Sequence, residues 1–321
     1  MKKVLTISFV LLLLFSCRDK DRKITLAGSS GRINLLTIVV ENSLWKGSVG
    51  DSLREIIASP VLGLPQEETQ FSVSQAPPSS FGRLLKPSRN ILIVGIDEKS
   101  GYSVQKDVYA SPQIIMTILG KDKTSLIQQI NAHRKEIISV FKKGDIELFQ
   151  KKITKEIWKV DDVKTLSKLG IALKIPKTYA LVDDTGDFLW FRQDIPKGSM
   201  NLIAYSFPLV ETDSIANSII ARRDSIGKKN IPGTLEGMHM ITELAYSPFL
   251  KQIQLDNKLT FESKGIWEMK NDFMAGPFLN YTVVDKTNNR LVIVEGFTFS
   301  PNVKKRDYMF ELEAILKTLK L

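Results

Sequence analysis

Residues 280–299 read NYTVVDKTNNRLVIVEGFTF, and this stretch determines the fold class of the C-terminal half. Two runs rich in β-branched residues flank Asn288 and Asn289, and Asn tolerates the positive φ that a tight hairpin turn requires. An earlier pair of runs flanks Asp184-Thr185-Gly186 in the same way. Because hairpins join antiparallel strands, the pattern predicts a mainly antiparallel sheet in this half.

Outward from this hairpin, the same half contains further apolar runs and two amphipathic segments. The short runs predict strands, whereas apolar residues spaced by three and four predict helices. We expect strands at 171–175, 202–207, 238–245 and 259–269, and helices at 213–226 and 305–319.

The N-terminal half has a different pattern, in which continuous apolar runs alternate with helical segments. Residues 33–40 (INLLTIVV) and 90–96 (NILIVGI) are typical of strands that are buried on both faces. A helix is expected over residues 43–58, with Ser43 as its cap.

A helical block separates the two halves. Its apolar stripe, which starts at Leu126, predicts a long helix interrupted at Gly144, and the acidic pair at 161–162 can cap a further short helix. We place the domain boundary near Lys159. The predicted fold class is α+β, with a mixed α/β first half and a mainly antiparallel sheet-plus-helix second half. The predicted units are a signal peptide (1–16), a lipidated tether or linker (17–32), a mixed α/β domain (33–159) and an antiparallel α+β domain (160–321).

The N-terminus has the form of a bacterial lipoprotein export signal. Two lysines precede an apolar run over residues 4–15, which is too short to span a bilayer because a span requires about 20 residues. The run ends at Leu14-Phe15-Ser16-Cys17, which resembles a lipobox, and Cys17 is the only Cys in the chain. We expect residues 1–16 to be removed and Cys17 to be lipidated. The alternative is an ordinary signal peptide followed by an incidental Cys.

A lipid on Cys17 would make the bilayer a partner of this chain, because several acyl chains anchor a protein stably. The charged run at 18–23 has a net charge of +2, and Ala27-Gly28-Ser29-Ser30-Gly31 is typical of a flexible linker. Surface-exposed lipoproteins of Bacteroidota-like bacteria tend to carry an acidic run at this place, and the run in this sequence is not acidic. We therefore expect a lipid-anchored envelope protein, on the outer membrane and facing the periplasm.

The composition excludes several classes of function. The chain has 321 residues, of which 43% are hydrophobic and 25% charged, as in a folded globular protein of about two domains. One Cys and two His exclude an intramolecular disulfide and leave little for a metal centre, and neither a P-loop nor a dinucleotide fingerprint occurs. We expect no cofactor and no metal, and export makes nucleic acid an unexpected partner.

The excess of basic residues is spread along the chain. Residues 121–164 contain eleven basic and seven acidic side chains, which is typical of a solvated helical face. The alternative is contact with anionic lipid headgroups.

Two serine motifs match hydrolase signatures. Gly50-Asp51-Ser52-Leu53 matches that of an esterase class, and Ser43-Leu44-Trp45-Lys46 matches the S-x-x-K of penicillin-recognising enzymes. A nucleophilic Ser requires a positioned base, and the companion motifs of both classes are missing from the sequence. We interpret both serines as helix residues, and His133, which lies on an apolar helical stripe, as buried.

Four residues form the candidate ligand surface: Trp190, Arg192, His239 and Glu243. His239 and Glu243 lie four residues apart and would share one face of a strand, which makes them the best acid–base candidates in the sequence. Trp190 and Arg192 alternate onto one side of their strand together with Phe188, and an aromatic residue with an Arg suits a ligand surface. The alternatives are a structural His on a sheet face and cross-strand packing, respectively.

Six segments carry a family resemblance: 64–68 (LPQEE), 77–81 (PPSSF), 89–94 (RNILIV), 175–177 (IPK), 188–194 (FLWFRQD) and 295–297 (EGF). They resemble an uncharacterised family of Bacteroidota lipoproteins, domain of unknown function 4837, over nearly the whole mature chain. None of the segments is a catalytic motif, and the family implies no activity. The second half is also similar, more distantly, to Mog1/PsbP-type domains, in which a strand ending in Ile-Pro starts an antiparallel sheet closed by a C-terminal helix. That likeness implies a non-enzymatic binding or assembly factor.

The sequence therefore favours a membrane-tethered, non-catalytic binding or assembly factor of the envelope, whose partner is an envelope protein or a small-molecule ligand. The alternative is an envelope hydrolase with a site around His239 and Glu243. A pocket with convergent polar groups of shifted pKa would favour the enzyme, whereas an open apolar or aromatic patch would favour binding.

Overall fold

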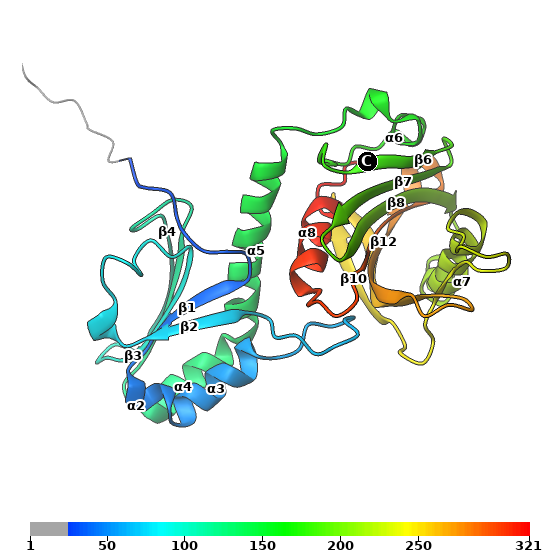
Figure 1. The fold of residues 1–321 in the computed structure, drawn as a ribbon. Helices are drawn as coiled ribbons and strands as arrows, with labels where there is room; N and C mark the ends of the chain where they lie inside the picture. Colours follow the sequence, from blue (N-terminus) through cyan, green and yellow to red (C-terminus); the bar gives the residue numbers. More distant parts are fainter. Residues whose placement is uncertain (1–24) are drawn as a thin grey trace, which may run out of the picture.

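The computed structural model describes residues 25–321, which fold into two separate β-sheets covered by helices (Figure 1). The predicted signal peptide, Cys17 and the charged run at 18–23 lie outside the described residues. One sheet has five strands and the other has eight. The predicted α+β class is confirmed, with a mixed first half and an antiparallel second half. Within residues 25–321, no helix is both long and apolar enough to cross a membrane.

The first sheet is parallel except at one edge. Its strand order is β2-β1-β3-β5-β4, and only β4 runs antiparallel to its neighbour. Because side chains alternate between faces, Leu36 and Ile38 point to one side whereas Ile91 and Ile115 point to the other. The strands are β1 (Leu35–Val39), β2 (Ser72–Ala76), β3 (Asn90–Ile96), β4 (Gly101–Lys106) and β5 (Ile114–Gly120).

Helices cover one face of this sheet and enclose the first core. Leu53, Ile137 and Phe141 from these helices are fully buried against the sheet. α4 begins with a capping box, in which the Asp122 carboxylate accepts the Ser125 N–H and the Ser125 hydroxyl accepts the Asp122 N–H. The helices are α2 (Asn42–Trp45), α3 (Ser48–Ile57), α4 (Lys123–Ala132) and α5 (Arg134–Ile153).

The helix breaks differ from those that the sequence predicts. Residues 43–58 form two helices instead of one, and Ser43 lies inside α2, whose N-cap is Glu41. The long helix is interrupted at His133 and continues through Gly144. A Cβ at Gly144 would meet the tip of the Ile114 side chain of β5, so the helix passes close to the sheet at this glycine and does not end there.

The segment at residues 27–31 is not the flexible linker that its composition predicts. Ser30 donates its N–H to the Pro87 carbonyl at 2.8 Å, and the Ser30 carbonyl accepts the Arg89 N–H at 2.8 Å. Isolated bridges pair this segment with the first half at two places. Backbone hydrogen bonds therefore attach residues 27–31 to the folded body.

The second sheet is antiparallel and curved (Figure 1). Its strand order is β10-β11-β12-β13-β8-β7-β6, and the short β9 pairs with one end of β11. The predicted turn between β12 and β13 is confirmed, with Asn289 at a φ of 49°. The strands are β6 (Ala180–Asp184), β7 (Phe188–Ile195), β8 (Gly198–Pro208), β9 (Met240–Thr242), β10 (Phe249–Leu255), β11 (Lys258–Met269), β12 (Ala275–Asp285) and β13 (Arg290–Phe299).

Helices lie on both faces of the second sheet, which gives this half two cores. On one face, Leu312 of the C-terminal helix packs in a cluster with Val294 of β13, and on the other face Ile215 of α7 packs near Ile293. The predicted C-terminal helix is thereby confirmed. The helices are α6 (Lys164–Leu169), α7 (Thr212–Asn230) and α8 (Arg306–Leu316).

Several details of the second half differ from the prediction. Residues 171–175 form no strand, and the strand predicted over 238–245 is reduced to the three residues of β9. α6 is capped from a distance by Asp184, whose carboxylate accepts its first two N–H groups, and not by the acidic pair at 161–162. The sequence also fails to predict β10, because an edge strand that is exposed on most of its residues has no buried stripe.

Candidate functional site

The two halves meet at a cavity of about 680 Å³, which we call the cleft. The helices α5 and α8, one from each half, pack against each other beside it (Figure 1). This volume lies within the range of small-molecule sites, about 300–1,000 Å³. The apolar side chains of its wall are Val61, Leu62, Leu64, Ile138, Phe249, Leu250, Phe278, Leu279, Met309 and Phe310.

The loop at residues 58–71 reaches from the first half to the second and forms one side of the cleft. Gly63 adopts a φ of 79°, and a Cβ on it would lie 2.8 Å from the Cβ of Lys264, so this close approach requires glycine. The buried Glu68 carboxylate accepts the N–H groups of the two residues that begin α8, at 2.5 and 3.2 Å. A loop of the first half thus caps a helix of the second.

Lys142 extends from α5 into the wall of the cleft. Its ammonium donates to Asn34 Oδ1 at 2.6 Å and to the Gln70 carbonyl at 2.7 Å, and it lies 4.9 Å from the centre of the Phe71 ring. Burial, followed by the positive charge of Arg306, lowers the pKa of Lys142 to about 8. Both hydrogen-bond acceptors are neutral, so this cation has no carboxylate in contact with it among the described residues.

The carboxylates of the cleft, in contrast, are paired. Glu313 of α8 lies 2.5 Å from Lys317 Nζ and 3.6 Å from Lys264 Nζ. Burial by itself raises the pKa of Glu313, but these two cations lower it to about 2. Glu262 of β11 lies 3.7 Å from the Lys264 ammonium and accepts the Tyr281 hydroxyl. Burial alone would lower the pKa of Lys264, but Glu313 and Glu262 outweigh it and raise that pKa.

The remaining side of the cleft is the edge strand β10. Phe249 and Leu250 are 51% and 46% exposed, and Lys251 beside them is exposed as well. β10 pairs only with β11, so the sheet leaves its outer edge open. All three residues line the cleft, Phe249 and Lys251 from the face of β10 that they share with Lys264 and Glu262, and Leu250 from the other face.

His239 and Glu243 flank β9 but do not contact each other. Four residues of extended chain separate them by about 13 Å. His239 Nδ1 lies 3.1 Å from the Gly237 carbonyl. Two hydrogen bonds lower the pKa of Glu243: the larger effect comes from the Ala245 N–H and the smaller from the bond that Glu243 shares with Glu268. That shared bond raises the pKa of Glu268. The acid–base pair proposed from the sequence is therefore not assembled, because Glu243 is engaged with another carboxyl group.

Trp190 and Arg192 lie on β7, and each is engaged locally. Trp190 is half-buried and donates its indole N–H to Asn201 Oδ1 at 3.0 Å, whereas the exposed Arg192 pairs with Asp194 at 2.8 Å. Four strands of the sheet lie between β7 and β9. The four predicted surface residues thus occupy two separate places, and none of them lines the cleft.

The serine motifs are helical, as interpreted from the sequence. Ser52 donates its hydroxyl to the Ser48 carbonyl one turn earlier in α3, and Ser43 lies within α2. The expected burial of His133 is wrong. This residue lies half-buried at the break between α4 and α5, where it stacks on Tyr102 with ring centres 4.0 Å apart.

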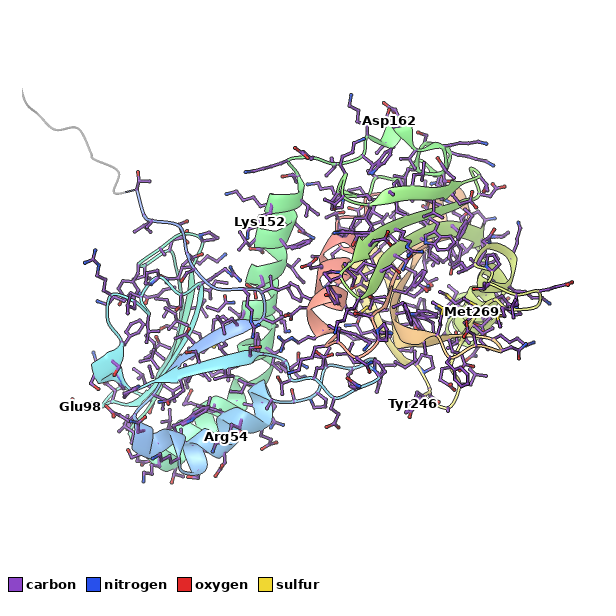
Figure 2. The ribbon with its side chains drawn as sticks, viewed as in Figure 1. Arg54, Glu98, Lys152, Asp162, Tyr246 and Met269 are labelled. Atoms are coloured by element: carbon purple, nitrogen blue, oxygen red, sulfur yellow. The ribbon has the colours of Figure 1, made fainter. Side chains whose placement is uncertain are left out.

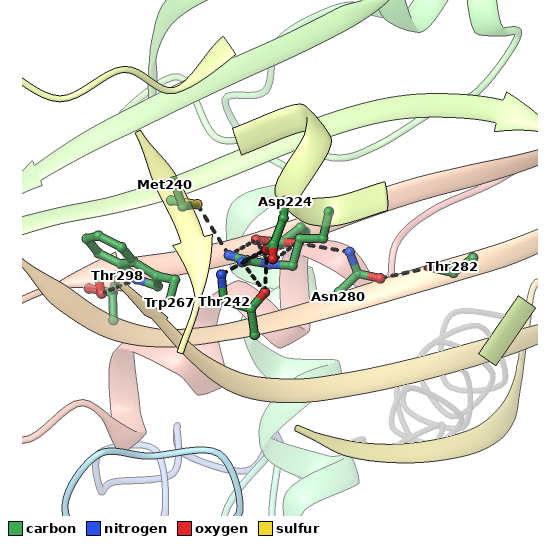
Figure 3. A network of polar contacts seen from close by, with 9 residues as sticks. Asp224, Met240, Thr242, Trp267, Asn280, Thr282 and Thr298 are labelled. Carbon is green, nitrogen blue, oxygen red and sulfur yellow. Dashed lines mark hydrogen bonds and ion pairs between the residues drawn. The ribbon is translucent and has the colours of Figure 1, made fainter. Parts of the chain in front are cut away.

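The second half also contains a buried ion pair outside the cleft (Figure 3). The Arg223 guanidinium of α7 donates to both oxygens of Glu295 on β13, at distances of 2.9–3.1 Å. It also donates to the Thr242 hydroxyl of β9, and Asn280 donates to Glu295 at 2.9 Å. The pair therefore joins α7, β9, β12 and β13, which is a structural role.

The loop that joins β9 to β10 is exposed at residues 244–247. Figure 2 shows Tyr246 on this loop at the periphery of the second half, where its side chain is 69% exposed. Tyr246 does not line the cleft.

The residues that do line the cleft were not singled out from the sequence. One signal was present: Lys142 follows Ile138 by four positions, so a lysine lies on the same helical face as a cleft-lining apolar residue.

The fold and the cleft define a two-sheet α+β protein with a ligand-sized cavity between its halves. A family model described as domain of unknown function DUF4837 matches residues 156–318, and one described as domain of unknown function DUF8532 matches residues 29–154. Because the first match covers half of the chain, the protein belongs to the DUF4837 family, as the sequence predicts. The predicted extent of the resemblance, nearly the whole mature chain, is wrong, because the DUF4837 model matches residues 156–318 only and the resembling segments of the first half fall within the range of the second model.

Comparison with solved structures finds a likeness to LpqN, which is involved in cell envelope biogenesis of Mycobacterium tuberculosis. The TM-score is 0.32 and the sequence identity 11%, over 47% of this chain and 82% of LpqN. We base no inference on a likeness of this size. No curated protein matches this chain.

Proposed function

We propose that this protein is a non-catalytic binding factor of the bacterial envelope, held at a membrane by a lipid on Cys17, with the cleft as its ligand-binding site. The cleft itself carries the proposal: it is a cavity of about 680 Å³ whose wall combines exposed apolar side chains with cations. Small-molecule sites commonly have this form, an apolar wall with a few placed polar groups.

The cleft contains features of both binding sites and active sites. Charged groups with shifted pKa converge in it, which favours an enzyme, and Phe249 and Leu250 form an open apolar patch, which favours binding. The pKa shifts of Glu313 and Lys264 arise from ion pairing and move both groups away from neutral pH, whereas the pKa of Lys142 is lowered toward it, to about 8. Among the described residues, the lining contains no Ser, Thr, Cys or His. Binding is therefore better supported than catalysis by a Ser, Thr or Cys nucleophile.

Lipidation of Cys17 would place this cleft at a membrane surface, which we take to be the periplasmic face of the outer membrane. Cys17 ends an apolar run of export-signal form. Cys17→Ser is expected to abolish metabolic labelling with a fatty acid and to release the protein from membranes. Retention of the Ser variant in the membrane fraction would contradict the tether.

The cleft can be tested with a neutral dye whose fluorescence rises in apolar surroundings, titrated into the folded body, residues 25–321. We expect saturable binding, and Leu250→Glu is expected to weaken it about tenfold because a charge replaces part of the apolar wall. Phe273→Glu is the matched control, since Phe273 is fully exposed and does not line the cleft. Binding that does not saturate, or an equal loss in both variants, would contradict the proposal.

A further inference from the structure

The charges of the cleft do not balance. Glu262 and Glu313 share Lys264, and Glu313 also pairs with Lys317, so the protein neutralises its own carboxylates here. Lys251 takes part in none of the ion pairs or side-chain hydrogen bonds found among residues 25–321, although Glu262 lies opposite it in the register of β10 and β11. Together with Lys142, it leaves two cations at the cavity that lack a carboxylate in contact.

Lys142 retains hydrogen-bonding capacity. An ammonium has three donors, and two of them are used on the Asn34 side chain and the Gln70 carbonyl. One donor of a half-buried cation is therefore left for an anion, and an unpaired cation in partly apolar surroundings is unfavourable. The charged groups that act on Lys142 at longer range are Arg306, Glu313, Asp145 and Asp307.

The apolar wall of the cleft is uncovered in the described chain. Leu62, Phe249 and Leu250 are 46–51% exposed although all three are large and apolar. The buried Met309 and Phe310 continue this wall inward. A ligand that is apolar along its length and anionic at one end matches both the wall and the unpaired cations.

We propose that the cleft binds a long-chain carboxylate, with its acyl chain along the wall and its carboxylate on the Lys142 ammonium, within the field of Lys251. This inference rests on the proposed function, because it names the ligand class of the same site. A carboxylate satisfies the free donor of Lys142 with a charge-assisted hydrogen bond. A neutral chain of equal length would fill the wall but leave both cations unpaired.

The test is acetylation of lysines on the full chain in isolated membranes, measured for each residue by mass spectrometry. Acetylation requires the neutral amine, so a bound carboxylate protects a lysine by covering it and by keeping it protonated. Saturating decanoate is expected to reduce labelling of Lys142 about fivefold and to reduce that of Lys251 as well, whereas 1-decanol reduces neither. Lys168, which is 58% exposed on α6 and does not line the cleft, is the internal control.

Substitutions separate charge from packing. Lys251→Met lies on an exposed edge and retains an apolar stem, so it is expected to weaken decanoate binding more than it weakens dye binding. Lys142→Met is expected to weaken decanoate binding about tenfold. Lys142→Arg keeps the positive charge, so it is expected to weaken decanoate binding no more than the Lys251 variant does. Decanoate affinities are measured by displacement of the neutral dye.

The outcomes are distinguishable. Equal protection by decanoate and 1-decanol, or protection by neither, overturns the carboxylate proposal while saturable dye binding still supports a ligand-binding cleft. Failure of the dye to bind overturns the proposed function itself. Protection that rises with protein density in the absence of added ligand identifies a second copy of this chain as the occupant, and it also overturns the carboxylate proposal.

Discussion

Arg223 and Lys142 are both cations withdrawn from solvent, but their surroundings differ. Arg223 lies in the second half against the equally buried Glu295, and its guanidinium has a carboxylate and a hydroxyl as acceptors. Lys142 lies beside the cleft and has only neutral acceptors. The first arrangement is complete and has no capacity for a ligand, whereas the second is incomplete. Burial of a charge alone therefore does not indicate a binding site, and the proposal for the cleft depends instead on a cation beside a cavity with no carboxylate in contact with it.

The largest effect is expected at the complete pair. Arg223→Ala leaves Glu295 charged and buried, so we expect the free energy of unfolding to fall by about 3–5 kcal/mol in urea denaturation at pH 7. The matched control is Arg222 on the same helix, which lies 5.0 Å from the Phe207 ring centre and should cost about 0.5–1 kcal/mol when changed to Ala. Similar losses in the two variants would mean that the pair does not hold α7 to the sheet.

Glu68 is a buried carboxylate next to the cleft, and unlike Lys142 it is fully engaged, because each of its two oxygens accepts a backbone N–H. Glu68→Ala removes the cap of α8 and a link between the halves, so we expect a loss of about 1–2 kcal/mol in the free energy of unfolding. Dye binding to the cleft should weaken too, since the loop at 58–71 forms one of its sides. Glu67→Ala, at an exposed neighbouring position, is the control and should change neither quantity.

Glu311 is an acidic counterpart of Lys142. Burial, and then the charge of Asp307, raises the pKa of Glu311 from 4.5 to about 7. The folded state therefore binds this proton more tightly than the unfolded chain, and the stability contributed by this group falls as pH rises from about 4.5 to about 7. Glu311→Gln should be more stable than the wild type by on the order of 1 kcal/mol at pH 8 and equal to it at pH 4. Denaturation at both pH values checks this, and a difference independent of pH would refute it.

The smallest effect on stability is expected at Lys142 itself. Its pKa is lowered from 10.5 to about 8, so between these pH values the unfolded chain binds more protons than the folded protein, and the contribution of Lys142 to stability rises with pH. Lys142→Met lacks this group and should lie within about 1 kcal/mol of the wild type at pH 7. The free energy of unfolding of the wild type, measured by urea denaturation, should then rise relative to that of the variant from pH 8 to pH 10.5. Lys143→Met, on the exposed side of α5, should show no such trend.

The antiparallel half was predictable because its pattern is local. In residues 280–299 each strand and its turn carry their own signal, and Asn289 has the positive φ that the turn requires. The break at His133 and the continuity through Gly144 were not predictable. Whether a glycine ends a helix or lets it approach a sheet depends on β5, which is remote in sequence.

The cleft could not be predicted for the same reason. Lys142 lies on a helix that resembles a solvated basic face in the sequence, and its unusual surroundings come from Asn34, Gln70 and Arg306, which only the fold brings together. His239 and Glu243 were grouped from spacing alone, and the structure shows that shared strand periodicity does not bring two side chains into contact. Lipidation of Cys17 stays a prediction, because that residue lies outside the described chain.

The attachment of residues 27–31 to the first half limits how far the protein could move from a membrane. Only nine residues lie between Cys17 and Ala27, and the ten steps from one Cα to the next span at most about 36 Å in a fully extended chain. A lipid on Cys17 would therefore hold Ala27, and with it the part of the first half to which residues 27–31 are bonded, within about 36 Å of the bilayer surface.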